Sequence, residues 1–212
     1  MKGLIRNNFY SMESNLIISF IMATALVFMP LFIKNIMIYP VIIAVQIFLF
    51  VVNTGTALHA DNVAKWDKFE LTLPIKRCMI IGAKYITFML LILLGLVMGL
   101  CTTICIYFFG EPWSFISVFW GYEYGLVLSI ISISLMYPII LKIGTEKNEL
   151  ILILSAFAAI GIMLLIAFLL SSVTEGMNLR HPIVGIASII VSLVLFMISF
   201  LISLHLHRNK EF

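Results

Sequence analysis

One acidic residue lies within a long apolar stretch and is the first candidate for chemistry. Glu123 is the only charged residue between positions 112 and 141. A charged side chain inside a membrane is costly, and such residues commonly line a substrate path, bind a proton or pair with a cation. Alternatively, a short re-entrant piece over residues 112–120 would leave Glu123 at the outer surface. All of these interpretations remain open from the sequence.

Other residue types that catalyse reactions or bind metals are sparse. Cys101 and Cys105 are four residues apart, and His205 and His207 are two apart, which places the two histidines on different faces of a helix. A zinc site needs more ligands than either pair supplies. The sequence contains no G-x-x-x-x-G-K-[ST] phosphate-binding loop, and its basic residues are not clustered as in nucleic-acid-binding proteins. We therefore predict no catalytic residue, metal, cofactor or nucleic-acid partner, and an intramembrane enzyme is the least favoured function.

The elements that carry these residues are predicted to be membrane-spanning helices. Hydrophobic residues make up 63% of the 212-residue chain and charged residues 11%, against about 45–50% and about 25% in soluble domains. The mean hydropathy is +1.17. A helix needs about 20 apolar residues to cross the hydrocarbon core. We predict an all-α polytopic membrane protein, one transmembrane domain over residues 1–212, with spans near 16–33, 36–58, 79–109, 115–140, 150–171 and 183–205.

The distribution of basic residues predicts the orientation. With six spans, both termini lie on one side of the membrane. That side would hold eleven of the thirteen Lys and Arg residues, all except Lys34 and Arg180. Because Lys and Arg concentrate in cytoplasmic loops, both termini are predicted to be cytoplasmic.

The residues before the first span are predicted to form an amphipathic helix at the membrane surface. Ile5, Phe9 and Met12 follow one another at i, i+4 and i+7, which places them on one helical face. A frayed tail over residues 2–15 is the alternative.

A second amphipathic helix is predicted between spans 2 and 3. Asp61 and Asn62 are candidates for its N-cap. Trp66, Phe69 and Leu73 then form an apolar stripe at i, i+3 and i+7. Such a helix either lies on the membrane surface or docks a cytoplasmic partner, and the residue types favour neither.

Two of the predicted cytoplasmic segments resemble those of one family. The run WDKFELTLPIKR at 66–77, followed by Lys84 and Tyr85, is similar to the first cytoplasmic loop of small type-2 ATP-binding-cassette (ABC) exporter permeases. The run YPIILKIGTEK at 137–147 is similar to a later loop of the same group. Six spans, the chain length and the N-terminal helix agree with this resemblance.

The resemblance implies the permease subunit of an ATP-driven exporter in a bacterial cytoplasmic membrane. Two such subunits, identical or different, pair in the lipid bilayer. Separate cytoplasmic ABC ATPase subunits, which bind ATP and Mg, dock beneath them through a coupling helix, here over residues 61–73. The implied ATPase-coupling residues are Trp66, Asp67, Lys68, Phe69, Glu70, Leu73, Lys142, Glu146 and Lys147.

The resemblance also implies an amphipathic or hydrophobic cargo. Small permeases of this type export antimicrobial or amphipathic peptides or confer resistance to them, and a lipid-like cargo fits the same description. The alternative function is a self-contained, proton-coupled secondary transporter or channel that uses Glu123, although the sequence shows no evident inverted repeat.

Overall fold

The computed structural model describes residues 1–66, 69–70, 76–110, 115–173 and 181–209. Within these residues the chain is helical and has no strand. Six helices are long and apolar enough to cross a membrane, which confirms the predicted all-α, six-span fold. The helices are α1 (Lys2–Ser11), α2 (Glu13–Phe32), α3 (Tyr39–Val63), α5 (Arg77–Phe109), α6 (Phe115–Ile143), α7 (Asn148–Val173) and α8 (Pro182–Asn209).

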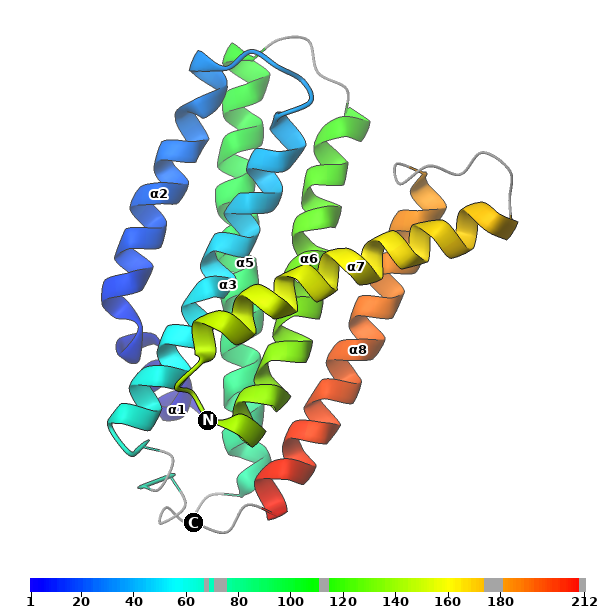
Figure 1. Ribbon diagram of the computed structural model, residues 1–212. Helices are drawn as coiled ribbons and strands as arrows, with labels where there is room; N and C mark the ends of the chain where they lie inside the picture. The colour runs from blue at the N-terminus through cyan, green and yellow to red at the C-terminus, as the bar shows by residue number, and fades with distance from the viewer. Residues whose placement is uncertain (67–68, 71–75, 111–114, 174–180, 210–212) are drawn as a thin grey trace.

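The helices run alternately between the two ends of one bundle (Figure 1). Helix α1 and the last turn of α8 lie at the same end, which we call the basal end. The opposite end, which carries the chain between α2 and α3, is the distal end. Helix α7 crosses α6 obliquely, from the basal end of α3 toward the distal end of α8.

The predicted spans are found, but helix α3 ends later than the sequence indicates. It continues through Val63, so Asp61 and Asn62 lie in its last turn and do not cap a new helix. No Gly or Pro interrupts residues 56–63. The structure therefore corrects the predicted start of the coupling helix at residue 61.

Helices α3 and α6 form the centre of the bundle. In α3 and α6, 61% and 56% of the apolar window is buried, against 28–33% in the other four spans. Ile47 of α3 lies against Gly95 of α5 on one side and Gly125 of α6 on the other. A Cβ added to Gly95 would be 2.7 Å from the Cα atom of Ile47, so the glycine permits direct backbone contact.

Buried polar side chains link α3 to two of its neighbours, α2 and α5, within the apolar region. The Gln46 amide donates a hydrogen bond to the Ala23 carbonyl of α2 at 3.1 Å and accepts one from Thr102 of α5 at 2.7 Å. The Asn53 amide donates to the Ser19 hydroxyl at 2.9 Å. These bonds hold α2, α3 and α5 in register, because a polar group in hydrocarbon has no water to bond.

An aromatic cluster joins α5 to α8. The ring centroids of Phe196 and Phe200 lie 5.0 and 5.2 Å from that of Tyr85, in edge-on contact. The Tyr85 hydroxyl forms hydrogen bonds with Ser199 at 2.7 Å and Ser203 at 3.0 Å. Helix α8 is thereby fixed against α5 along its basal half.

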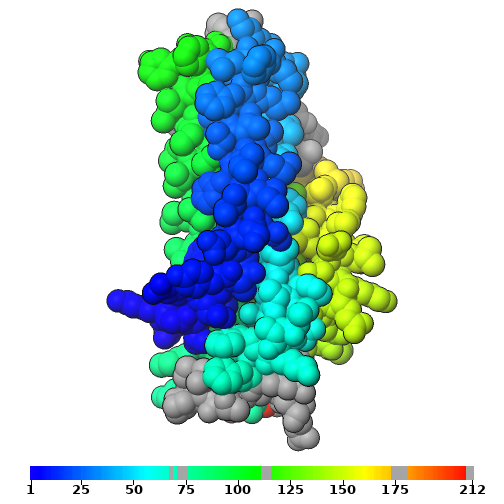
Figure 2. All heavy atoms as spheres, turned by 90° about the vertical axis from the view of Figure 1, so that its left-hand side faces the viewer, coloured from blue at the N-terminus to red at the C-terminus, as the bar shows by residue number. Residues whose placement is uncertain are grey.

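Helix α1 lies across the basal part of the bundle and precedes α2 directly (Figure 2). It spans Lys2–Ser11, so the predicted N-terminal helix is confirmed over a shorter range than the expected residues 2–15. Leu4 and Asn8 are its buried residues, whereas Ile5 and Phe9 are half-buried. Met12, which follows the helix, is also buried. The buried face is shifted by about one residue from the predicted stripe, because Asn8 forms a hydrogen bond with α5.

Candidate functional site

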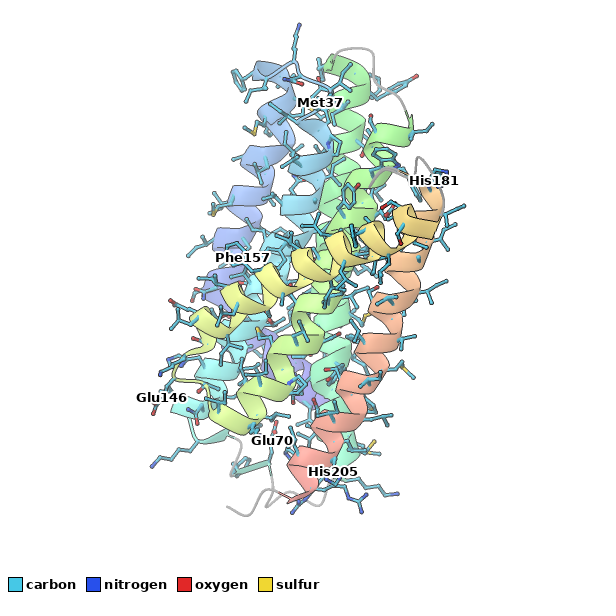
Figure 3. The ribbon with its side chains drawn as sticks, turned by 45° about the vertical axis from the view of Figure 1, so that its right-hand side comes forward. Met37, Glu70, Glu146, Phe157, His181 and His205 are labelled. Carbon is cyan, nitrogen blue, oxygen red and sulfur yellow. The ribbon has the colours of Figure 1, made fainter. Side chains whose placement is uncertain are left out.

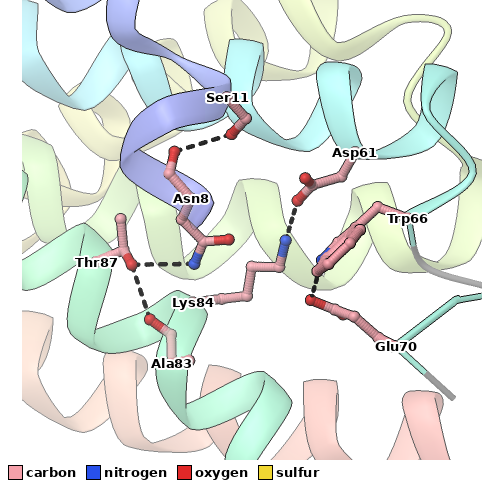
Figure 4. Close-up of polar contacts among 8 residues, drawn as sticks. All are labelled: Asn8, Ser11, Asp61, Trp66, Glu70, Ala83, Lys84 and Thr87. Carbon is pink, nitrogen blue, oxygen red and sulfur yellow. Dashed lines mark hydrogen bonds and ion pairs between the residues drawn. The ribbon is translucent and has the colours of Figure 1, made fainter. Parts of the chain in front are cut away.

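The candidate site begins where α3 ends at the basal end (Figure 4). Lys65 has a φ of 52°, in the left-handed region. Its N–H donates to the Asn62 carbonyl at 3.0 Å, and the Ala64 N–H donates to Ala60 at 2.9 Å. A left-handed residue just beyond the last turn is a common way for a helix to end. The chain therefore changes direction before Trp66.

The Trp66 segment presents one face outward and one inward. The indole N–H of Trp66 donates to the Glu70 carboxylate at 2.6 Å, and the Trp66 and Phe69 ring centroids are 5.1 Å apart. Glu70 is buried, whereas the Phe69 side chain is 51% exposed. Phe69 is thus on the outer side of the segment, and Glu70 faces the bundle (Figure 3). Asp67, Lys68 and Leu73 lie outside the described residues.

A buried ion pair lies beside this segment. The Lys84 ammonium of α5 contacts the Asp61 carboxylate of α3, and both side chains are almost completely buried (Figure 4). A buried charge is tolerated when an opposite charge compensates its lost hydration. The pair therefore fixes the last turn of α3 to α5. Sequence reasoning missed it, because the two residues are 23 positions apart and their meeting depends on how α3 and α5 pack.

The second candidate loop is attached to the same turn of α3. The Asn62 amide donates to the Thr145 hydroxyl at 2.6 Å, and the Asn148 amide donates to the Gly55 carbonyl at 3.0 Å. Gly144, with a φ of 100°, makes the turn between α6 and α7. The predicted contact residues on this stretch are all exposed, namely Lys142, Glu146 and Lys147. The structure thus anchors both predicted coupling segments to the end of α3.

A small cavity of about 50 Å³ joins these groups to α8. Glu70, Lys84, Thr145 and His207 are among the residues that line it. His207 is buried and His205 is exposed, as their two-residue spacing predicts. The Arg77 guanidinium donates to the backbone carbonyls of the last α8 residues, at 2.7 and 3.0 Å. The basal ends of α3, α5, α6 and α8 therefore form one connected cluster.

Glu123 lies in the distal half of α6 and is separate from this cluster. Helix α6 is continuous from Phe115, so residues 115–120 are its first turns and not a separate re-entrant piece. The Glu123 side chain is buried against Gly185 of α8, where an added Cβ would overlap its carboxylate. Gly121 and Gly125, which are four residues apart and share one helical face, contact α3 on the opposite side of the helix. Among the described side chains, none forms a hydrogen bond or ion pair with Glu123.

The described residues form neither a cluster of metal ligands nor a disulfide. No group of three or more His, Cys, Asp or Glu side chains in that part of the chain is placed to hold a metal ion. Cys78, Cys101 and Cys105 are free.

Comparison with known proteins identifies the family. No curated protein and no solved structure matches the chain. A family described as "ABC-2 family transporter protein" matches residues 3–207, which include all six spanning helices and most of α1. This match covers nearly the whole chain, so the chain belongs to the ABC-2 family of transporter proteins.

Proposed function

We propose that the chain is the permease subunit of an ATP-driven ABC exporter and that its basal end docks the ATPase. Membership of the ABC-2 family supports the permease role. The observation that carries the docking proposal is that both segments meet the last turn of α3. The Trp66 segment follows that turn directly, and the α6–α7 loop is bonded to it through Asn62 and Thr145. Asp61 of the same turn is paired with Lys84 of α5. Two exposed segments on one rigid support form a suitable surface for a motor protein.

The charge distribution supports a cytoplasmic basal end. Lys2 and Arg6 of α1 and Lys76 at the start of α5 lie there, together with the basic residues of the α6–α7 loop. Of the Lys and Arg residues that the structure describes, Lys34 is the one at the distal end. Basic residues mark the cytoplasmic side of bacterial membrane proteins.

These contacts provide a route by which a movement of the ATPase would reach the membrane-spanning helices. A displacement of Phe69 would act on Glu70 and on the turn at Lys65, and from there on α3. The Asp61–Lys84 pair would pass it to α5, and the Asn62–Thr145 bond would pass it to the α6–α7 loop. Side-chain contacts between rigid helices carry such movements in other switching proteins. The ATPase would bind ATP and Mg and supply the energy.

We further propose that two permease subunits pair in a bacterial cytoplasmic membrane and export an amphipathic or hydrophobic cargo. An amphipathic or antimicrobial peptide or a lipid-like molecule fits this class. The large apolar side chains exposed on α2, α5, α7 and α8 support a site of action within the bilayer. The second subunit is either identical or closely similar in layout.

Co-purification tests the docking proposal. A tagged chain is recovered from its native membranes in mild detergent, beside the double variant Trp66→Ala with Phe69→Ala. A matched control carries Phe119→Ala with Trp120→Ala at the distal end, where Phe119 is 53% exposed against 51% for Phe69. We expect an ABC ATPase to be recovered with the wild type and with the distal control. The Trp66→Ala, Phe69→Ala variant should recover about tenfold less ATPase, because it lacks the proposed docking side chains. Equal recovery from both variants, or no ATPase with folded wild type, would contradict the proposal.

A second function is favoured by one observation. Glu123 is a buried carboxylate with no partner among the described side chains, which is the arrangement expected of a proton site. A proton-coupled secondary transporter or channel would move its substrate in a pH gradient without an ATPase. The isosteric variant Glu123→Gln would abolish this flux. An ATP-driven exporter predicts no gradient-driven flux by the purified chain, and transport that continues in the Glu123→Gln variant.

A further inference from the structure

A polar pocket opens at the basal end, on the face shown in Figure 2. Its volume is about 680 Å³, and it lies between the corner that joins α1 to α2, the last turns of α3 and the start of α7. The side chains that give it its polar character include Asn15, His59, Glu146, Lys147 and Glu149. Pockets of about 300–1,000 Å³ are typical of small-molecule sites.

An apolar groove continues from this pocket along two spans. The groove has a volume of about 380 Å³ and runs between α2 and α3. Six of its ten lining residues are apolar, among them Met22, Phe48 and Val52, and the surface exposed to the groove is mostly apolar. Asn15 and Thr56 line both the groove and the polar pocket, so the two are contiguous. Together they form a site that is polar at the basal end and apolar within the membrane-spanning region.

This polarity indicates the kind of ligand. A soluble protein cannot fill the groove, because the groove runs along helices that lie in hydrocarbon. A small polar solute would leave the groove empty. A membrane lipid fills both parts, with its headgroup in the pocket and an acyl chain in the groove, where burial of apolar surface stabilises it.

The charges of the pocket select among lipid headgroups. Lys147 can bind a phosphate, and Glu146 and Glu149 can accept hydrogen bonds from a primary ammonium group. Phosphatidylethanolamine carries both groups. Phosphatidylglycerol carries the phosphate without the ammonium, and its negative charge would meet two carboxylates and one lysine.

We propose that the pocket and groove bind one phosphatidylethanolamine molecule from the leaflet at the basal end. The inference goes beyond the permease assignment. It shares Glu146 and Lys147 with the loop that the docking proposal assigns to the ATPase, but its test uses the chain without an ATPase. The proposal requires that the start of α2 lies at a membrane–water boundary. The sequence of α2 agrees with this, because the polar residues Glu13 and Asn15 precede its apolar part.

Lipid retention on the purified chain tests this proposal. Phosphatidylethanolamine and phosphatidylglycerol are offered in equal amounts in detergent, and native mass spectrometry measures the lipid that stays bound. We expect phosphatidylethanolamine to be retained about tenfold more than phosphatidylglycerol. The double variant Lys147→Gln with Glu149→Gln should remove this preference. Equal retention of the two lipids by the wild type would overturn the proposal.

A matched pair of variants locates the lipid. Val52→Trp fills the groove, whereas Val97→Trp adds the same ring to a lipid-facing position of α5. The two valines are 41% and 46% exposed. Val52→Trp should lower phosphatidylethanolamine retention about tenfold, and Val97→Trp should leave it unchanged. If both variants retain as much lipid as the wild type, or if Val52→Trp instead dissociates a dimer of the chain, the groove is not a lipid site. Because no ATPase is present, failure here is distinct from failure of the co-purification experiment.

Discussion

The Asp61–Lys84 pair is the residue-level contact on which the proposed coupling depends most. Its two members come from different helices, and both are buried almost completely. Removing one member of such a pair leaves an isolated charge without hydration, whereas replacing both members by neutral side chains is often tolerated. The pair therefore acts as a fixed connection between α3 and α5 only while both charges are present.

Single and double substitutions at Asp61 and Lys84 test whether the two charges compensate each other. We expect Asp61→Asn or Lys84→Met alone to lower the free energy of unfolding by about 3–5 kcal/mol, because each leaves an uncompensated buried charge. The double variant should recover most of this loss. Thermal unfolding in detergent measures the effect. Losses that simply add in the double variant would show that the two charges do not compensate each other.

Sequence reasoning identifies the residues of this region more readily than their partners. The Trp66 and α6–α7 segments are recognisable from their motifs. The burial of Glu70 against the bundle is not, because an acidic residue beside an aromatic stripe is usually solvated. Two contacts depend on where α3 ends, namely the Glu70–Trp66 hydrogen bond and the Asp61–Lys84 pair. The sequence does not reveal that α3 extends to Val63, because no Gly or Pro marks its end.

At the scale of the elements, α3 is held between two glycine-bearing helices. Gly95 of α5 and Gly125 of α6 contact it at the level of Ile47, and Gly121 contacts it one turn nearer the distal end. These close approaches let α3 pack tightly along much of its length. Glycines four residues apart share one helical face, but which helix packs against that face is known only from the packed structure.

Replacing a glycine by alanine tests how closely α3 and α5 approach each other. Gly95→Ala places a Cβ 2.7 Å from the Ile47 Cα atom, so the helices must separate, at a cost of about 1–3 kcal/mol. Gly161→Ala in α7 is the control, since nothing lies within 4 Å of its added Cβ, and it should be neutral or stabilising by up to about 1 kcal/mol. Thermal unfolding in detergent compares them. Equal midpoints for the two variants would show that α3 and α5 are not in direct backbone contact.

At the scale of the whole molecule, the two ends of the bundle differ in kind. The basal end carries α1, which is bonded to α5, and the α6–α7 loop, which is bonded to α3. It also carries the Trp66 segment, which follows the last turn of α3 in the chain. The distal end carries a buried carboxylate between α6 and α8. Composition and run lengths predict six spans, because crossing the bilayer sets the length of each apolar run. Composition does not predict the proposed lipid site, since its pocket and groove arise from four segments that meet only in the folded chain.

Site-specific crosslinking in living cells tests the account most directly. A photoreactive amino acid replaces Phe69, which is exposed at the basal end, or Met37, which is exposed at the distal end. After irradiation, mass spectrometry identifies the crosslinked protein. The account predicts an ABC ATPase adduct from position 69 and none from position 37. An ATPase adduct at position 37, or none at position 69 in a correctly folded chain, would contradict the proposal that the basal end docks the motor.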